Sequence, residues 1–421
     1  MVDMTAQSGP MLAADGTPLK ISLARALRRQ KMRALMLIAP LLLFILLTFL
    51  APIADMLFRS VENDIVPRTL PRTVEALSDW DSSSGEIPGE PVFAALAADL
   101  KEAVAIKIHT RVGSRLNYET PGIASLFRKT GRKVKKLEDT NYREQFIEIH
   151  KGWGDIEVWQ TINRFSGNYT PGYFLGAVDA EVNQDGLRMK PDDEQIYLYL
   201  FGRTFMMSVA ITVTCLLLGY PVAWLLANLP LRTSNLLMIL VLLPFWTSLL
   251  VRTSAWIVLL QQQGVVNDTL VALGIVGDQN RLQMMFNQTG TIIAMTHILL
   301  PFMILPLFSV MKTIPPSYLR AAKSLGATDW TAFWRVYFPQ SVPGIGAGAI
   351  LVFIVAIGYY ITPELVGGTS GIFISNRIAY HISTSLNWGL GAALAVILLG
   401  VVLILYWTYD KIVGIDNVKL G

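Results

Sequence analysis

Long apolar stretches alternate with polar ones along the chain, and six of the apolar stretches are long enough to cross a bilayer. The first is the uncharged run at residues 34–54. The other five lie at about residues 204–227, 235–260, 291–311, 344–363 and 389–409. Because a helix needs roughly 20 apolar residues to span the hydrocarbon core, the pattern predicts six transmembrane helices.

Basic residues come just before the first apolar run. They are Arg25, Arg28, Arg29, Lys31 and Arg33. A signal peptide shows the same order of features, but this run is long enough to span and lacks a clear small-residue cleavage site. By the positive-inside rule, residues 1–33 form a cytoplasmic tail and residues 34–58 the first transmembrane helix. Six crossings then return the tail at 412–421 to the cytoplasm.

Between the first two spans lies a long polar segment, residues 59–203, which the orientation of the first helix places in the periplasm. Residues 67–91 are rich in Pro, Ser and Gly. Apolar residues at helical spacing follow, and they predict a buried face made of Phe93, Leu96, Leu100, Val104 and Ile108. Asp99 is expected to lie off this face. A second helix is predicted around Phe146, and the segment as a whole is interpreted as a mainly helical, soluble insertion.

The run RKTGRKVKK at residues 128–136 holds six basic residues. A nucleic-acid patch is conceivable on charge alone, but no aromatic residues are interleaved with the charges. A solvated face or a docking patch for an acidic partner is favoured, and no nucleic acid is expected as a partner. The run does not contradict a periplasmic location, because long loops translocate largely regardless of charge.

The composition agrees with a membrane protein: 52% of residues are apolar and 16% are charged. The single cysteine, Cys215, excludes an intramolecular disulfide and a thiolate metal cluster. The four histidines lack the i, i+4 partners of a metal site, and the sequence contains no G-x-x-x-x-G-K-[ST] phosphate loop. No catalytic residue, metal or cofactor is therefore expected, and any ATP hydrolysis belongs to another polypeptide.

The stretch at residues 315–343, between the fourth and fifth spans, is charged and aromatic and too polar to cross a bilayer. Ser317 can cap a helix that ends at Gly326, where glycine tolerates the left-handed conformation of a helix end. Thr328 can cap a second helix that runs to Pro339. This pattern predicts a helical hairpin on the cytoplasmic side. By itself it also fits an ordinary interfacial hairpin.

The hairpin resembles the Glu-Ala-Ala motif of permease subunits of binding-protein-dependent ABC importers. The residues that carry the resemblance are Ala321, Ala322, Gly326 and Pro339, with Val336 and Phe338 in place of the motif's Ile and Leu. Arg320 stands where the motif has Glu, which reverses a charge. The resemblance implies that these residues contact an ABC ATPase.

Four further segments resemble the spermidine/putrescine-type permeases in particular. They are residues 217–230, 247–260, 296–307 and 361–368. The resemblance implies an all-α membrane protein of the type I ABC importer permease kind, with a permease core at 204–411. It also implies a bacterial inner-membrane location, two ATPase copies, a second and related permease chain and a periplasmic solute-binding protein. Polyamines are the favoured solute.

Polar groups inside or beside the spans are the candidates for a solute path, since a charge at membrane depth is costly and faces a cavity or a partner. Along a straight helix Arg252 lies about 24 Å above the cytoplasmic start of the third span. His297 lies in the outer part of the fourth span, and Glu364 follows Tyr359 and Tyr360 at the outer end of the fifth. Carboxylate and tyrosines suit a cationic amine. Snorkelling or plain packing is the alternative for each residue.

Two other classes of protein remain open from the sequence. An ATP-independent carrier or channel would not need a patterned cytoplasmic hairpin. A membrane sensor with a periplasmic ligand domain would need a cytoplasmic output domain, and only a short tail follows the last span. Gly344-x-x-x-Gly348 in the fifth span predicts close helix packing, as plain packing within the chain rather than a dimer motif.

Overall fold

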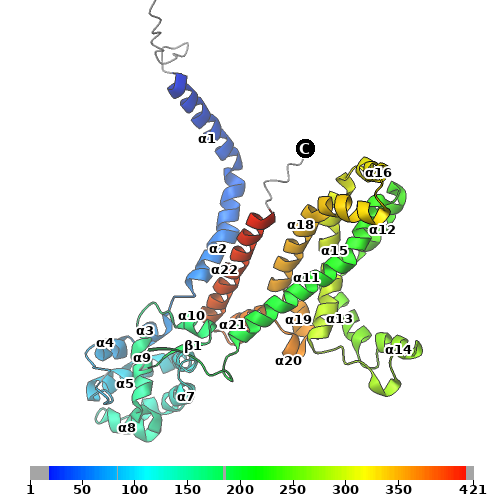
Figure 1. Ribbon diagram of the computed structural model, residues 1–421. Helices are drawn as coiled ribbons and strands as arrows, with labels where there is room; N and C mark the ends of the chain where they lie inside the picture. Colours follow the sequence, from blue (N-terminus) through cyan, green and yellow to red (C-terminus); the bar gives the residue numbers. More distant parts are fainter. Residues whose placement is uncertain (1–18, 83, 184–185, 414–421) are drawn as a thin grey trace, which may run out of the picture. The chain divides into compact units, whose positions relative to one another are not determined.

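The computed structural model describes residues 19–82, 84–183 and 186–413, and within them it is mostly helical, as predicted (Figure 1). The chain divides after Phe58 into two compact units. Residues 1–18 and 414–421, which make up most of the two predicted tails, lie outside the described residues.

The first unit is one long helical rod. Helix α1 (Leu19–Ile45) passes through a π-helical turn (Leu46–Leu50) into α2 (Ala51–Phe58). The span at Leu27–Phe58 is long and apolar enough to cross a membrane. The helix begins well before the predicted start at residue 34, because the Arg, Lys, Leu and Ala residues ahead of it are all good helix formers.

The insertion is a set of short helices followed by a two-stranded antiparallel sheet. The helices are α3 (Ile65–Thr69), α4 (Pro71–Leu77), α5 (Glu90–Ala105), α6 (His109–Leu116), α7 (Ile123–Lys133), α8 (Tyr142–Ile149), α9 (Ile156–Arg164) and α10 (Gly172–Ala177). The strands are β1 (Ala180–Asn183) and β2 (Gly186–Met189). The stretch at 67–91 is thus partly helical, since Pro71 fits the first turn of α4.

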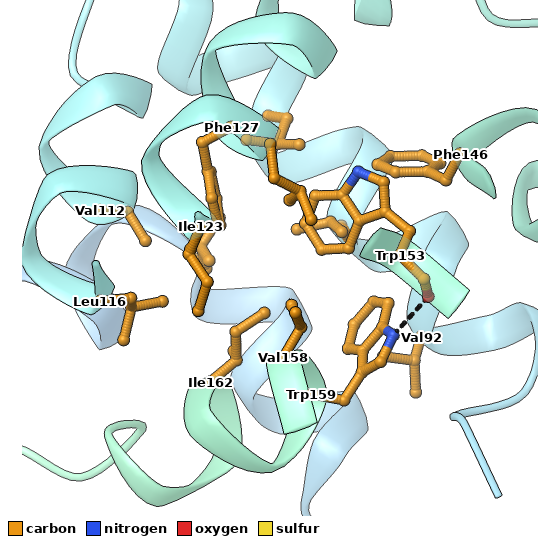
Figure 2. Packing of buried hydrophobic residues seen from close by; sticks show 14 of the residues in the cluster. Val92, Val112, Leu116, Ile123, Phe127, Phe146, Trp153, Val158, Trp159 and Ile162 are labelled. Carbon is orange, nitrogen blue, oxygen red and sulfur yellow. Dashed lines mark hydrogen bonds between the residues drawn. The ribbon is translucent and has the colours of Figure 1, made fainter. Parts of the chain in front are cut away.

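The insertion has a hydrophobic core of its own (Figure 2). Phe93, Leu96 and Leu100 are fully buried on α5, as the helical spacing predicts. Phe146 of α8 and Trp153, in the turn that follows, also lie in this core. The core is therefore built from apolar residues at helical spacing and closed by aromatic rings.

Two indole N–H groups lie inside this core, and both have acceptors. Trp159 Nε1 donates to the backbone oxygen of Trp153 at 2.9 Å, the contact drawn in Figure 2. Trp153 Nε1 donates to Thr130 Oγ1 at 2.9 Å. Because no buried donor is left unpaired in either ring, the aromatic centre carries no desolvation penalty from its N–H groups.

The expectation that Asp99 lies off the buried face is wrong: the residue is 1% exposed. Helix α4 covers that side of α5, and the Asp99 carboxylate accepts hydrogen bonds from the backbone nitrogen of Thr73 at 2.8 Å and from Thr73 Oγ1 at 2.7 Å. Burial raises the pKa of Asp99 in spite of these bonds and of Arg72, 3.6 Å away. The buried carboxylate of Asp99 thus connects α5 to α4 through hydrogen bonds.

The permease bundle follows the insertion. Its long helices are α11 (Tyr197–Asn228), α15 (Gln288–Thr313), α18 (Phe338–Gly358) and α22 (Trp388–Val413). Its shorter helices are α12 (Leu231–Leu242), α13 (Leu249–Leu260), α14 (Val265–Ala272), α16 (Pro316–Ser324), α17 (Asp329–Ala332), α19 (Ile361–Val366), α20 (Gly368–Gly371) and α21 (Ile374–Ser383). Counting the first unit, the described residues contain five helices that could each cross a membrane, or six if one bent pair counts as a span.

The predicted third span is that bent pair, and its prediction as one straight helix is wrong. The chain bends by 96° between the stretches Leu231–Trp246 and Leu249–Ala272. Pro244 opens a 3-10 turn, and Ser248 is extended and caps α13 through a bond from the Val251 backbone nitrogen to its hydroxyl. The straight-helix height of Arg252 therefore does not apply.

The close packing predicted from Gly344 and Gly348 is confirmed within the chain. A Cβ atom at Gly348 would lie 2.7 Å from Met303 Sδ of α15, and one at Gly344 would lie 3.0 Å from Val310 Cβ. Glycine at these positions lets the backbones of α15 and α18 approach closely, which is how helices gain contact in lipid.

Hydrogen bonds at the two ends of α11 show which segments lie at each end of the bundle. At its start, Tyr197 Oη lies 2.9 Å from Nε2 of His381, and Thr204 Oγ1 accepts a bond from the backbone nitrogen of Ile374. At its finish, Lys312 Nζ donates to the backbone oxygen of Ala227 at 3.1 Å. Since Lys312 lies in the last turn of α15, the helices α11 and α15 run in the same direction.

The insertion and the hairpin lie at opposite ends of this bundle. Tyr173 and Ala177 of α10 pack into one cluster with Leu200, at the start of α11, and with Leu390, at the start of α22. The hairpin instead follows the finish of α15. Anything that binds the hairpin therefore meets the bundle at the end remote from the insertion.

Candidate functional site

The first helix of the hairpin (residues 315–343) ends as its sequence predicts. Gly326 is left-handed, with φ +90°. The backbone nitrogen of Gly326 donates to Lys323 O and that of Ala327 donates to Ala322 O, each at 3.0 Å. These two bonds form a Schellman cap. The start differs from the prediction: Pro315 occupies the N-cap position and Ser317 makes no capping bond, because Pro316 takes the first helical position.

The second helix begins as predicted and does not stop where predicted. Thr328 caps it, with its hydroxyl accepting a bond from the Thr331 backbone nitrogen at 3.3 Å. The helix then runs from Asp329 to Gly358 as one span. Pro339 does not end it, although the proline nitrogen cannot donate a backbone hydrogen bond. A π-helical turn at Phe333–Tyr337 lies just before the proline, and its i to i+5 bonds replace the regular helical bonds there.

The tip of the hairpin presents apolar side chains to the surroundings. Leu325 is 89% exposed and Trp330 is 72% exposed. The ion pair between Lys323 and Asp329 joins the two helices of the tip. Of the motif residues, Arg320, Ala321, Gly326 and Pro339 are exposed, and Ala322, Val336 and Phe338 are half-buried.

Aromatic contacts connect the base of the hairpin to the bundle. The ring of Tyr220, in α11, lies 6.2 Å from that of Phe333 and 5.9 Å from that of Phe338. Its hydroxyl lies 3.0 Å from Ser341 Oγ, and Tyr337 beside it is 3% exposed. These contacts connect the base of the hairpin to α11 as well as to α18.

The structure brings three of the candidate path residues together at the insertion end of the bundle. Arg252 of α13 interacts electrostatically with His297 of α15 and with Tyr359. His297 Nδ1 also accepts a hydrogen bond from Trp256 Nε1 at 3.2 Å. Among the described residues, Arg252 Nε is buried without a hydrogen-bond partner. The guanidinium is therefore not held in place through this atom.

The other two candidates, Tyr360 and Glu364, form a second group on α19 and its N-cap. Both are exposed. Asn376 joins them, because its Nδ2 donates to Glu364 Oε2 at 2.6 Å and to the backbone oxygen of Tyr360 at 2.9 Å. Ser375 Oγ donates to the backbone oxygen of Tyr359 at 2.6 Å. Helix α21 thus fixes the orientation of the carboxylate and of both tyrosine backbones.

Asn376, Ser375 and Trp256 are the residues that sequence reasoning missed. Asn376 is 4% exposed although it lies in a short polar segment, and its role depends on contacts with residues far along the chain. The polar pair Ser375 and Asn376 follows an apolar stretch in the sequence and could have been noticed there. A polar pair does not show, however, which distant residues it will bind.

The four histidines lie apart in the fold. His109 and His150 belong to the insertion, where burial lowers the pKa of each. His381 of α21 is 5% exposed, and burial, together with the charge of Arg377, lowers its pKa to about 4. Over the described ranges, no three His, Cys, Asp or Glu residues are grouped so that they could hold a metal ion.

Comparison with known proteins places this bundle in a family. Residues 201–413 match the sequence model of the binding-protein-dependent transport system inner membrane component. The spermidine/putrescine transport system permease protein PotB of Escherichia coli K12 is 34% identical over 224 residues, which cover 52% of this chain and 81% of PotB. PotB of Salmonella typhimurium strain LT2 is also 34% identical, with 77% of its length covered.

A further relative extends the match. The inner membrane ABC transporter permease protein YdcU of Escherichia coli K12 is 31% identical over 273 residues, which cover 61% of this chain and 82% of YdcU. The family match includes the hairpin and every candidate path residue, and it leaves most of the insertion outside. The chain therefore belongs to the family of binding-protein-dependent inner-membrane transport components: it is a multi-pass permease subunit of an ABC importer, and the ATPase is a separate subunit.

Proposed function

We propose that this permease imports a polyamine-like cationic amine and that ATP hydrolysis drives the import through the 315–343 hairpin. The solute class is supported by the likeness to PotB, whose name describes a spermidine/putrescine system. It is also supported by the chemistry at the insertion end, where Glu364 supplies a carboxylate and Tyr360 an exposed aromatic ring. A carboxylate and aromatic faces are the groups that hold an organic ammonium.

The observation that carries the proposal is that the residues from Asp329 to Gly358 form one continuous helical span, which passes through the π-helical turn at Phe333–Tyr337 and includes Pro343. One end of this helix is the hairpin tip with exposed Trp330, and the other ends at Tyr359 and Tyr360. A continuous helix transmits a displacement of one end to the other, whereas a flexible loop would absorb it. An ATPase that moves the tip therefore moves the tyrosines, which favours an ATP-driven importer over a carrier that works without ATP.

The same geometry supports a topology. The hairpin, at one end of the bundle, faces the ATPases in the cytoplasm, and the insertion faces the periplasm with the solute-binding protein. Both chain termini are then cytoplasmic. One hairpin per chain implies a second permease for the second of two ATPases, and we favour a related chain, as in the polyamine-type systems the sequence resembles.

Arg320 points to a feature of the ATPase partner. It is exposed on α16, and it replaces the acidic residue of the family motif. A cation at a contact surface is stabilised by an opposite charge and opposed by a like charge. The ATPase surface that meets Arg320 is therefore expected to be acidic or neutral at that point, and Arg320→Glu is expected to weaken assembly.

A leucine substitution tests the coupling. Leu325→Ala removes an apolar group at the hairpin tip and is expected to lower ATP-driven uptake by about tenfold, since a buried anchor at an interface contributes on the order of 1–3 kcal/mol. Leu187→Ala is the matched control, because Leu187 is 70% exposed on β2 at the other end. Uptake and co-purification of the ATPase are measured at equal membrane levels. Unchanged uptake and assembly with Leu325→Asp would refute the coupling role.

A second experiment tests the solute path separately. Glu364→Gln keeps the size of the side chain and removes its charge, and it is expected to raise the KM for spermidine uptake. Asn376→Ala is expected to act in the same direction by releasing the carboxylate. Glu144→Gln, on α8 of the insertion, serves as the control. Wild-type kinetics in both path variants, with coupling intact, would remove the path assignment and leave the coupling assignment standing.

A further inference from the structure

A hollow of about 450 Å³ lies away from the path residues, where α3 and α6 of the insertion face the loop that leads into α22. Its walls include the rings of Tyr118, Tyr173 and Trp388. A smaller cavity of about 170 Å³ shares Arg115, Tyr118 and Tyr173 with it. The volume of the larger hollow falls within the range of small-molecule sites, which combine apolar walls with a few polar groups.

Arg115 lines both hollows and is itself buried, with 2% of its side chain exposed. Its Nη1 donates to Glu119 Oε1 at 2.7 Å. Its guanidinium lies 4.7 Å from the Phe165 ring and 4.3 Å from the Tyr173 ring. Nε and Nη2 are buried without a hydrogen-bond partner in the described part of the chain. Glu119 and the Tyr173 hydroxyl supply acceptors to part of the guanidinium, and because leaving charged N–H groups unpaired is costly, a further acceptor at this site would stabilise Arg115.

The remaining charges around the larger hollow also favour an anion. Three arginines line it, namely Arg59, Arg111 and Arg115. The lining contains two carboxylates, those of Glu62 and Asp64, so positive charges outnumber negative ones. The loop before α22 forms another part of the wall, and the start of this long helix carries a partial positive charge. Burial raises the pKa of Tyr173, so its hydroxyl stays protonated at neutral pH.

We propose that this hollow binds a small organic carboxylate, whose anionic group accepts hydrogen bonds from Arg115 while its carbon chain packs against Tyr173 and Trp388. Glu62 and Asp64 allow the same molecule to carry an amine. An occupant touches both the insertion and the start of α22, so it braces the one against the other. The inference goes beyond the proposed function, because it needs neither the hairpin nor the path residues.

Three probes of matched length test the proposal on the full-length protein in lipid nanodiscs: butyrate, 4-aminobutyrate and butylamine. Isothermal titration is expected to show binding of the two carboxylates and none of butylamine. Tighter binding of 4-aminobutyrate than of butyrate would assign a role to Glu62 and Asp64. Absence of binding by both carboxylates at millimolar concentration, or binding of butylamine as tight as theirs, would overturn the proposal.

Substitutions locate the binding. Arg111→Gln is expected to weaken carboxylate binding by about tenfold, the usual effect of losing one charge-assisted hydrogen bond. Arg115→Met is expected to abolish it. Because Arg115→Met can disturb the insertion, Arg111→Gln is the deciding variant, and Arg128→Gln, on the exposed side of α7, is the control. Equal affinity in Arg111→Gln and Arg128→Gln would place the ligand elsewhere and refute the site.

Discussion

The insertion and the permease bundle bury different kinds of side chain. Among the described residues, the largest fully buried side chains all belong to the insertion except Phe373. They include Trp153, Trp159 and Phe93, whose rings lie edge to face or tilted against their neighbours. The bundle instead brings its helices together at Gly219, Gly344 and Gly348. It leaves many large apolar side chains exposed, among them leucines of α11, α12 and α22.

A difference of this kind is expected when one region is surrounded by water and the other by lipid. Burying a large aromatic surface away from water provides a strong driving force, so a segment surrounded by water stabilises itself with big rings. Lipid is as apolar as the side chains, so helices in the bilayer gain little from burying them and gain more from close backbone contact. The two kinds of buried residue are those expected of a segment in water and of helices in lipid, and three experiments test this comparison.

Truncating the aromatic centre is expected to have the largest effect. Trp153→Ala removes a fully buried ring and leaves a cavity, which costs about 3–5 kcal/mol of unfolding free energy. Trp330→Ala, at the exposed hairpin tip, is the matched control and is expected to leave that free energy unchanged. Denaturant titration followed by protease sensitivity of the insertion measures both. Equal stabilities would contradict the assignment of a separate core to the insertion.

Acid is expected to weaken the junction between the two regions through His381. Its folded pKa of about 4 lies below the ordinary value near 6.5, so the unfolded chain binds more protons between these values. The contribution of neutral His381 to the free energy of unfolding is therefore fully present above the unfolded pKa. It is lost as the pH falls from about 6.5 to 4, and the loss amounts to at most about 3 kcal/mol.

Thermal unfolding from pH 7 to 4 measures this loss, and His381→Gln is the reference. Glutamine still offers hydrogen bonds to Tyr197 and Ser385, the partners of His381 in the structure, but it does not titrate. The variant is expected to show a flatter profile than the wild-type protein. A wild-type profile as flat as that of the variant would rule out His381 as the titrating group.

The smallest effect is expected from adding one methyl group to a helix contact. Gly348→Ala places a Cβ against Met303, and overpacking of this kind costs about 1–3 kcal/mol. Gly400→Ala adds the same methyl in α22, where nothing lies within 4 Å, and helix propensity favours alanine there. Thermal stability in detergent compares the two. If both variants are equally stable, α15 and α18 are not in the close contact described.

Local sequence was sufficient wherever a structure depends on neighbours along the chain. Gly326 and Thr328 predict the turn of the hairpin, because a left-handed residue and a capping hydroxyl act within a few positions. The apolar runs predict the long helices, because hydrocarbon selects by length and composition. The spacing of Ala321, Ala322 and Gly326 was also enough to indicate the family.

Local sequence failed at Asp99, where a distant partner decides, and at Pro339 and Ser248, where the residue types do not show the local backbone conformation. Asp99 is buried because α4 covers it, and Thr73 supplies its bonds. Pro339 does not stop its helix, because a π-helical turn precedes it. The break in the third span at Ser248 is the same kind of failure, since an apolar run contains no mark of a bend other than Pro244.

By itself the sequence determined that this is a helical membrane protein with a helical hairpin and a long polar insertion, since hydropathy, caps and motif spacing are properties of neighbouring residues. Tertiary structure decided which polar groups meet: Arg252 with His297 and Tyr359, and Glu364 with Asn376. It also decided that Arg115 lies buried beside a hollow. These contacts join residues far apart along the chain, and only packing brings such residues together.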